Sequence, residues 1–463
     1  MVFSSSIFLW CFLPLVFVIN YFIQAKWSNA FLLIASLIFY AWGEPYLVFL
    51  MILMILLNWL VGLGIDRFAH KKLVLIIGII FDLGILGYYK YAAFVVEILN
   101  NLMRGGMFPA PAIRLPIGIS FFTFQAISYI VDVYRKETKA QKKIVNVALY
   151  ISFFPQLIAG PIVKYRDINE QIENRIITGE GIAEGFRRFI YGLSKKVLIS
   201  NVLGKSADSI FALDITAVNG GLAWVAALFY TFQIYYDFSG YSDMAIGLGR
   251  MFGFHIPENF NYPYLSLSIQ EFWRRWHISL SSWFKEYIYI PLGGNRKGKI
   301  RTYVNLFVVF FLTGLWHGAS YSFIIWGLYH GFFSIIERLG FKKILDRNKF
   351  VSWIYCFLVV NFGWVIFRMN YLKKALRFIV RMLMPWRYYG KGASIWEYVS
   401  IQAVFIFVCA LAGSGLLQKV FSGKMADWWK YSKTEFIYCA IMLILCIAAI
   451  VSDTYNPFIY FQF

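Results

Sequence analysis

The sequence predicts an all-α integral membrane protein, and three observations support that prediction. Its 463 residues are 60% hydrophobic and only 15% charged, whereas soluble domains carry about 25% charged residues. The mean hydropathy is +0.62. The apolar residues form long continuous blocks instead of alternating stripes. Because little sequence is left for a soluble domain, we expect a single multi-pass membrane domain over residues 1–463.

The apolar blocks outnumber the crossings that we expect. About 11 transmembrane helices are predicted, and re-entrant or interfacial helices should account for blocks shorter than the ~20 residues of a full crossing. We divide the domain into N-terminal spans (1–133), a catalytic core (134–340) and C-terminal spans (341–463). The candidate blocks are residues 7–24, 29–42, 45–64, 73–96, 115–133, 144–160, 186–204, 221–238, 302–316, 319–337, 351–367, 399–418 and 434–451.

The distribution of charge predicts the topology. No charge precedes Lys26 and no cleavage site is evident, so the first block is interpreted as a span with an extracytoplasmic N-terminus. The basic segments 67–72 and 135–143 then lie in the cytoplasm, and the lightly charged segment 97–114 lies outside. Basic cytoplasmic loops account for most of the net charge of +20, so no nucleic-acid partner is expected. A basic cytoplasmic mouth would also attract anionic coenzyme A or an acidic carrier protein.

The cysteines give no sign of a metal site. All of them lie within apolar runs and none forms a CxxC pair, so we interpret them as small buried hydrophobic residues and expect no metal. They are Cys11, Cys356, Cys409, Cys439 and Cys446.

Residues 270–301, QEFWRRWHISLSSWFKEYIYIPLGGNRKGKIR, combine tryptophans with basic residues. Wound at 100° per residue, 273–287 forms an amphipathic helix of the kind that lies at a membrane interface, and Pro291 begins the turn that ends it. Its apolar side carries Trp273, Trp276, Leu280, Trp283, Phe284 and Tyr287, and its polar side carries Arg274, His277, Ser281 and Lys285.

The polar side of this helix has two interpretations. His277 is either an interfacial histidine bonded to a neighbour or a polar ligand for an acyl group or its carrier. Arg274, Arg275 and Lys285 could bind phosphates.

The following loop, which contains Arg296 and Lys297, also suits phosphate through its backbone amides and basic side chains. This loop lacks the strand–loop–helix setting of a P-loop. Its basic residues are explained equally well by the excess of Lys and Arg that is usual in cytoplasmic loops.

Polar side chains also interrupt the apolar sequence at 235–249, YYDFSGYSDMAIGLG: they are Asp237, Ser239, Ser242 and Asp243. We expect the two serines to cap a helix that restarts after Gly240. The two carboxylates are more readily explained by pairing with Arg274 or Arg275 than by direct chemistry.

His317 and His330 both lie in LTGLWHGASYSFIIWGLYHG, residues 312–331. On one straight helix they would be about 220° and about 20 Å apart, so they cannot serve one compact site unless the helix breaks. Gly314 and Gly318 flank His317 and would let a backbone or a substrate come close. Function and packing stay open for His317, and His330 is more readily explained by packing or an interface. A histidine at membrane depth suits a general base acting on an acceptor hydroxyl.

The longest motifs are YYDFSGYSDMAIGLGRMFGFHIPENFNYPY, FWRRWHISLSSWFKEYIYIPLGGNRKG, LTGLWHGASYSFIIWGLYHG and the terminal NPFIYFQF. Together with the N-terminal MVFSSSIFLWCFLPLVF and LIASLIFYAWGEP, they resemble the membrane-bound O-acyltransferase (MBOAT) family. Within it they are most similar to the bacterial alginate O-acetyltransferase (AlgI-type) branch. The resemblance runs essentially from end to end.

The resemblance implies a ring of tilted helices around a central funnel. The acyl donor would bind from the cytoplasm, and an extracytoplasmic partner protein would complete the transfer to a polysaccharide. The family's essential histidine falls on the Trp-His-Gly motif, at His317. A companion polar position matches His277, whereas no catalytic role is implied for His330.

We therefore expect a membrane enzyme, an O-acetyltransferase in the cytoplasmic membrane, acting toward a cell-envelope or exported alginate-like polysaccharide. Acetyl-coenzyme A or an acylated carrier protein is the expected donor, and no bound cofactor is expected. His317 would be the base and His277 would line the donor tunnel.

Arg274, Arg275, Lys285, Arg296 and Lys297 would bind the anionic donor at the cytoplasmic mouth. Two alternatives stay open. One is D-alanyl transfer from a carrier protein toward teichoic acid, which the related DltB-type branch performs. The other is a non-catalytic acyl or glycan transporter, although the inverted repeats typical of transporters are not evident.

Overall fold

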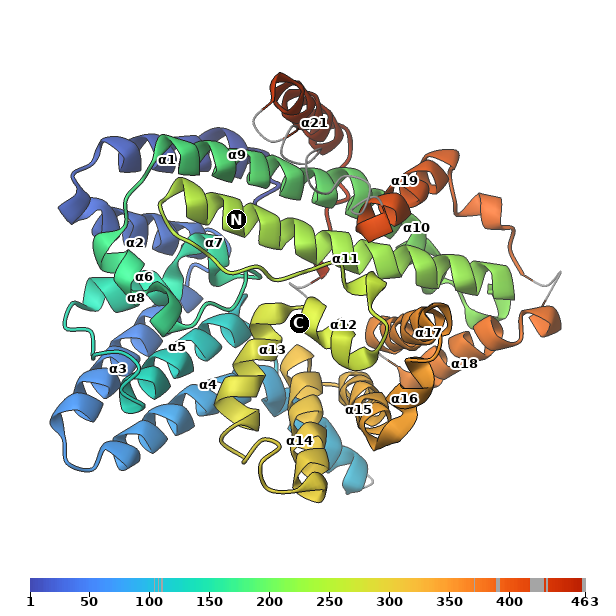
Figure 1. The fold of residues 1–463 in the computed structure, drawn as a ribbon, viewed down its shortest axis with the longest axis horizontal. Coiled ribbons are helices and arrows are strands. Elements are labelled where there is room, and N and C mark those ends of the chain that lie inside the picture. The colour runs from blue at the N-terminus through green and yellow to red at the C-terminus, as the bar shows by residue number, and fades with distance from the viewer. Residues whose placement is uncertain are drawn as a thin grey trace. The chain divides into compact units, whose positions relative to one another are not determined.

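The computed structural model describes residues 1–103, 105–106, 108–109, 111–369, 371–388, 392–416, 429 and 432–459. Within these residues all regular secondary structure is helical, which confirms the predicted all-α class (Figure 1). The last two residues of the predicted block 399–418 and the last four of the terminal NPFIYFQF motif lie outside the described residues.

Several helices are suited to a bilayer. In the part of the chain that the structure describes, five are long and apolar enough to cross a membrane: Leu47–Arg67, Lys71–Leu102, Lys299–His317, Lys349–Arg368 and Lys433–Ser452. Shorter apolar helices cover Phe8–Phe22, Ala25–Ala41, Ile119–Tyr134 and Ile401–Gly415. The chain is therefore a multi-pass membrane protein, while the count of about 11 crossings and the central funnel stay predictions.

Two compact units make up the chain. The first consists of Met1–Phe189 with Tyr241–Pro257, and the second of Ile190–Gly240 with Glu258–Phe463. The predicted segments 1–133, 134–340 and 341–463 are a functional division, which these units do not test.

The first unit is built around a buried helix. Each residue of α5 from Ile119 to Val133 is buried, because α3, α4, α6 and α8 pack around it. The elements of this unit are η1 (Phe8–Phe12), α1 (Leu13–Phe22), α2 (Ala25–Ala41), α3 (Leu47–Arg67), α4 (Lys71–Leu102), α5 (Ile119–Tyr134), α6 (Ile144–Ser152), α7 (Phe154–Leu157), α8 (Tyr165–Asn174) and most of α9 (Gly179–Ser194).

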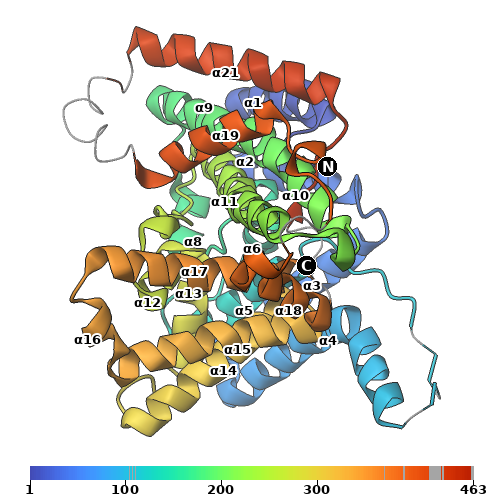
Figure 2. The ribbon, with the colours of Figure 1, turned by 90° about the vertical axis from the view of Figure 1, so that its right-hand side faces the viewer.

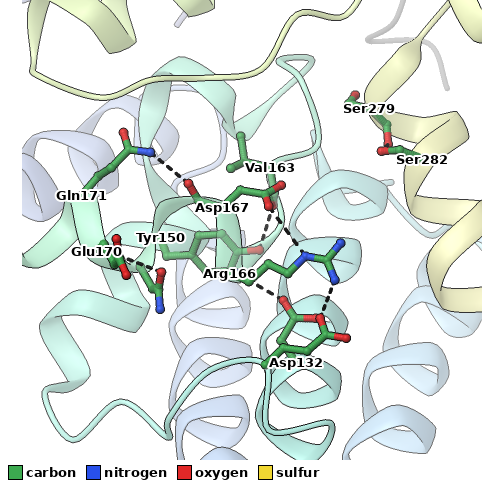
Figure 3. Close-up of polar contacts among 11 residues, drawn as sticks. Asp132, Tyr150, Val163, Arg166, Asp167, Glu170, Gln171, Ser279 and Ser282 are labelled. Atoms are coloured by element: carbon green, nitrogen blue, oxygen red, sulfur yellow. Dashed lines mark hydrogen bonds and ion pairs between the residues drawn. The ribbon is translucent and has the colours of Figure 1, made fainter.

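Polar contacts fix the chain that follows α7. The Tyr150 hydroxyl donates to the Val163 carbonyl at 2.8 Å, and the Arg166 backbone N–H donates to Asp132 at 3.3 Å (Figure 3). The Arg166 guanidinium also pairs with Glu137. The first bond satisfies a backbone carbonyl in the loop between α7 and α8, and the second satisfies an N–H in the first turn of α8.

The long helix α11 (Gly220–Met251) runs without interruption through both units. The predicted helix restart after Gly240, with Ser239 and Ser242 as caps, is therefore wrong. Gly240 is needed for close packing instead, since a Cβ there would lie 2.8 Å from the Gly192 carbonyl oxygen.

The carboxylates of α11 pair with residues other than the predicted arginines. Asp237 lies 2.6 Å from Lys196, and Asp243 lies 2.6 Å from Arg188. The predicted pairing with Arg274 or Arg275 is wrong. The cations come instead from Arg188 in α9 and from Lys196, in the segment that follows that helix directly. The structural role expected for the two carboxylates is confirmed.

The remaining elements of the second unit follow one another along the chain. They are η2 (Lys195–Ser200), α10 (Asn201–Ala212), η3 (Ile215–Ala217), η4 (Pro263–Leu265), α12 (Ile269–Arg275), α13 (Ile278–Phe284), η5 (Lys285–Tyr289), α14 (Lys299–His317), α15 (Tyr321–Ile336), η6 (Glu337–Phe341), α16 (Lys342–Leu345), α17 (Lys349–Arg368), α18 (Leu372–Leu383), η7 (Pro385–Tyr388), η8 (Ile395–Glu397), α19 (Ile401–Leu411), η9 (Ala412–Leu416) and α21 (Lys433–Ser452). Helices α14 and α15 lie side by side and α15 packs on α17, as Figure 2 also shows.

Candidate active site

The chain breaks at His277, where the sequence predicts a continuous helix over 273–287. Helix α12 ends at Arg275, His277 takes a left-handed conformation (φ 45°, ψ 56°), and α13 begins at Ile278. Two hydrogen bonds to the preceding segment cause the break. The Asn261 N–H donates to the Arg275 carbonyl at 2.9 Å, and the Ile278 N–H donates to the Asn259 carbonyl at 2.9 Å. Both groups are thereby removed from the helical bonding pattern.

The break moves His277 away from the polar stripe to which the sequence assigned it. His277 has no exposed surface, whereas Arg274 and Lys285 are exposed. The six residues predicted for the apolar side are all buried. The apolar half of the amphipathic pattern is therefore confirmed, and the placement of His277 on the solvated side is wrong.

Asn259 determines the proton arrangement on His277. Its side-chain oxygen lies 3.2 Å from the Ser279 backbone N–H and 2.8 Å from the Ser279 hydroxyl, which both donate to it. His277 Nδ1 lies 3.1 Å from the same oxygen. A carboxamide oxygen only accepts, so Nδ1 must carry the proton of the neutral ring. The lone pair then resides on Nε2, which is the arrangement a base or an acceptor requires.

The first turn of α13 is fixed as well. The Ser282 hydroxyl donates to the Ser279 backbone carbonyl at 2.9 Å, and both residues are labelled in Figure 3. The start of α12 is held by the Glu337 carboxylate, which accepts from the N–H groups of Ile269 at 2.6 Å and Gln270 at 3.1 Å. A buried anion at a helix N-terminus is favourable, because it satisfies N–H groups that have no partner within the helix.

His317 is the last residue of α14, and the glycines around it serve helix packing. A Cβ on Gly314 would lie 2.4 Å from the Phe323 carbonyl oxygen of α15, and one on Gly318 would lie 2.3 Å from the Phe323 ring. The expected close approach is therefore made by protein groups: a backbone at Gly314 and an aromatic ring at Gly318. This contact brings α14 and α15 together as a tight helical pair.

Aromatic rings enclose the His317 imidazole. Their centroids lie 4.9 Å away for Trp316, 4.9 Å for Trp326 and 5.3 Å for Phe367, and all three meet it nearly edge to face. Only 1% of His317 is exposed. Such an apolar enclosure disfavours the charged imidazolium and excludes water from the ring.

His330 shares a neighbour with His317. The chain breaks between the two histidines at Gly318–Ser320, so the straight-helix separation does not apply. Both rings pack against Trp326, with the His330 centroid 5.1 Å from it. His330 is fully buried, so its placement at an interface is wrong and the packing interpretation agrees with its surroundings. Neither of its ring nitrogens has a hydrogen-bond partner among the described residues.

Trp316 connects the two candidate catalytic histidines. Its ring lies 5.9 Å from that of His277 and 4.9 Å from that of His317. The structure therefore brings together two buried imidazoles from segments forty residues apart, both in ring contact with the same tryptophan.

The predicted donor-binding cations occupy different settings. Arg275 pairs with Glu271 at 2.8 Å and donates to the Asn261 carbonyl at 3.2 Å. Four others are exposed and form no ion pair within the described part of the chain: Arg274, Lys285, Arg296 and Lys297. The loop that carries the last two is tied to α14, because Asn305 donates to the Gly294 carbonyl at 2.9 Å.

Sequence reasoning missed the residues that orient the histidines. Asn259 lies in the quoted ENFNYPY segment, but nothing in its spacing relates it to a histidine eighteen positions later. Trp326 and Phe367 were interpreted only as membrane apolar residues. The described residues include no group of three His, Cys, Asp or Glu side chains able to hold a metal ion.

Comparison with known proteins identifies the family. Residues 119–379, more than half of the chain, match MBOAT, the membrane-bound O-acyltransferase family. The probable alginate O-acetylase AlgI of Pseudomonas putida is 42% identical, with 100% of both chains covered. The peptidoglycan O-acetyltransferase of Helicobacter pylori is 36% identical over 96% of this chain and 88% of its own.

A related branch is more distant. The teichoic acid D-alanyltransferase of Bacillus subtilis is 30% identical over 54% of this chain and 68% of its own. These similarities confirm the resemblance inferred from the motifs. The chain belongs to the membrane-bound O-acyltransferase family and is an acyltransferase of the multi-pass membrane type.

Proposed function

We propose that the protein transfers acetyl groups from a cytoplasmic donor toward an exported, alginate-like polysaccharide. The observation that carries the proposal is the pair of buried histidines, His277 and His317, whose rings both contact Trp316. Full-length similarity to an alginate O-acetylase and nearly full-length similarity to a peptidoglycan O-acetyltransferase support acetyl transfer to glycans.

In the proposed reaction His317 acts as the general base. It takes the proton of an acceptor hydroxyl while the hydroxyl oxygen attacks the carbonyl carbon of a thioester donor. A C–O bond forms, the C–S bond breaks, and the imidazolium returns the proton to the departing thiolate. The aromatic enclosure of His317 favours transfer over hydrolysis by keeping bulk water away.

His277 has a distinct proposed role. Its Nε2 lone pair would accept a hydrogen bond from the donor or from the incoming hydroxyl, and Asn259 would hold the ring in that arrangement. Rigid support of this kind is what orients a catalytic imidazole.

The donor is proposed to be acetyl-coenzyme A or an acetylated carrier protein. The phosphates of the donor would be bound by four exposed cations, Arg274, Lys285, Arg296 and Lys297. Arg275, which is paired with Glu271, is proposed as a fifth. Exposed cations raise the local concentration of an anionic donor, and this effect weakens as salt increases.

The proposed setting is the cytoplasmic membrane with an extracytoplasmic N-terminus. The donor would bind at the cytoplasmic face, and a partner protein on the outer face would complete the transfer to the polysaccharide. Neither step calls for a bound cofactor.

The test is reconstitution of the full-length chain in liposomes with acetyl-coenzyme A labelled in the acetyl group. We expect label in an acceptor supplied on the face opposite the donor, with free coenzyme A released in equal amount. Label that crosses the bilayer still attached to its donor would instead identify a transporter. Transfer from a D-alanylated carrier protein, in place of the acetyl donors, would identify the teichoic acid activity.

A further inference from the structure

An open pocket in the first unit has no role in the chemistry proposed above. Its volume is about 340 Å³, within the roughly 300–1,000 Å³ of small-molecule sites. It lies beside the turn between α2 and α3, the middle of α4 and the segment that leads into α5. Its lining residues are Glu44, Pro45, Tyr46, Leu47, Tyr88, Tyr89, Ala112, Ile113 and Arg114.

Three of the nine lining residues are tyrosines. Tyr46 is 84% exposed and Tyr88 is 59% exposed. Tyr88 and Tyr89 have ring centroids 5.2 Å apart and perpendicular planes. Each ring offers a flat apolar face with a polar hydroxyl at its end, which suits the C–H face and the hydroxyl rim of a sugar.

Arg114 gives the pocket a guanidinium that an ion pair with Glu44 holds in place. Its Nη2 lies 3.1 Å from a Glu44 oxygen and 3.1 Å from the Gly43 carbonyl. Glu44 is 2% exposed, whereas the Arg114 side chain is 69% exposed. A buried carboxylate therefore holds one edge of the guanidinium while the other edge faces outward. A guanidinium oriented in advance is well suited to bind a second carboxylate in bidentate geometry.

The course of α4 indicates on which side of the membrane the pocket lies. The helix starts at Lys71 and Lys72, and Tyr88 follows about 24 Å further along the axis. That rise is most of the ~30 Å hydrocarbon thickness, so the tyrosines lie at the face opposite the two lysines. With the lysines in the cytoplasm, the pocket faces outward. Beyond it, the Asn100 side chain forms two hydrogen bonds with the Phe108 backbone, at 2.8 and 3.0 Å.

We propose that this pocket binds a carboxylate-bearing glycan chain at the extracytoplasmic face, through Arg114 and the rings of Tyr46 and Tyr88. The inference rests on the proposed function, which delivers acetyl groups to a polysaccharide on that side. The pocket would hold the acceptor chain near the enzyme without contributing to acyl transfer. A phospholipid headgroup shares the anionic group but offers no flat ring to the tyrosines.

The test uses the full-length protein in nanodiscs of zwitterionic lipid. Saturation-transfer NMR measures binding of a hexuronate oligosaccharide and of a neutral glucose oligosaccharide of equal length. We expect the uronate to bind more tightly, and Arg114→Gln and Tyr46→Ala each to weaken it by about tenfold or more. Arg347→Gln and Tyr371→Ala remove exposed side chains of the same types elsewhere and should leave binding unchanged.

Two results would overturn the proposal. One is equal uronate binding by all four variants and the unaltered chain. The other is displacement of the uronate by glycerol phosphate at equal concentration, which would assign the pocket to lipid headgroups. Release of coenzyme A from acetyl-coenzyme A is measured in parallel and should persist in Arg114→Gln. Uronate binding by a chain that releases no coenzyme A would refute the proposed function and leave the glycan site standing.

Discussion

Asn259 is the residue whose role depends most on tertiary structure. Its side-chain oxygen collects donors from His277 and Ser279, so it determines which imidazole nitrogen carries the proton. Replacing it with alanine would leave the buried Ser279 N–H unsatisfied, which costs about 1–3 kcal/mol. The change would also let the imidazole proton move to Nε2.

We therefore predict that Asn259→Ala lowers kcat for acetyl transfer by about 10–100-fold, the range seen when an orienting hydrogen bond is lost. The measurement is steady-state transfer across a range of pH, because a change of imidazole proton arrangement should also alter the pH profile. Asn58→Ala is the matched control, since it removes a buried asparagine whose side chain donates to Asp82 at 2.8 Å and not to a histidine. Wild-type kcat and pH profile in Asn259→Ala would refute the positioning role.

At this scale the sequence pointed to individual residues but not to their surroundings. The Trp-His-Gly motif singled out His317 through its family resemblance. Nothing local placed Trp326 and Phe367 around it, because those residues come from α15 and α17. Enclosure of a side chain by distant elements is decided by packing, which periodicity does not encode.

At the scale of the helices, the sequence pattern was wrong in two places. It predicted a continuous helix through His277, where the chain breaks, and a helix start at Ser239 and Ser242, where α11 is continuous. The pattern over 273–287 matches a single helix, yet backbone bonds from Asn259 and Asn261 divide it. Conversely, α11 continues through the Ser239–Ser242 region that resembles a helix start. In both places long-range contacts override local preference, so a single segment cannot reveal the outcome.

The α14–α15 pair depends on small residues at the contact. A Cβ on Gly314 would overlap the Phe323 carbonyl of α15, and overpacking of this kind costs about 1–3 kcal/mol. We predict that Gly314→Ala lowers the melting temperature of the purified protein and displaces His317 enough to reduce acetyl transfer.

Gly84→Ala is the control for the Gly314 change, since a Cβ there meets nothing within 4 Å on the equally helical α4. Thermal unfolding in one detergent compares the two variants. Equal melting temperatures for both would show that the close contact between α14 and α15 at Gly314 is not needed for stability.

For the whole molecule, hydropathy predicted an all-α membrane protein but did not determine which helices cross the membrane. Five described helices meet the length of a span, and four more are apolar but shorter. Only one of these four, Ala25–Ala41, falls on a block that the sequence shows to be clearly too short, residues 29–42. The short block 302–316 lies instead in one of the five long helices, Lys299–His317. Among the four shorter helices, α5 is buried by other helices, and this burial is what permits polar residues such as Gln125 and Ser128 inside it.

The topology makes a separate prediction. In a cysteine-free background, Asn101→Cys should react with a membrane-impermeant maleimide added to spheroplasts, because the segment 97–114 is predicted to lie outside. Lys142→Cys, in the basic segment 135–143, should react only after the membrane is permeabilised. The reverse pattern would invert the topology and move the glycan pocket to the cytoplasm.

The central claim is that His317 is the base for acetyl transfer. The most direct measurement is the transfer rate from labelled acetyl-coenzyme A by His317→Ala in liposomes, beside His255→Ala as a control histidine that lies outside the aromatic enclosure. We predict that His317→Ala lowers the rate by about 10²–10⁴-fold while membrane insertion and melting behaviour are retained. His255→Ala should transfer at the wild-type rate. A wild-type rate in a correctly folded His317→Ala protein would contradict the account.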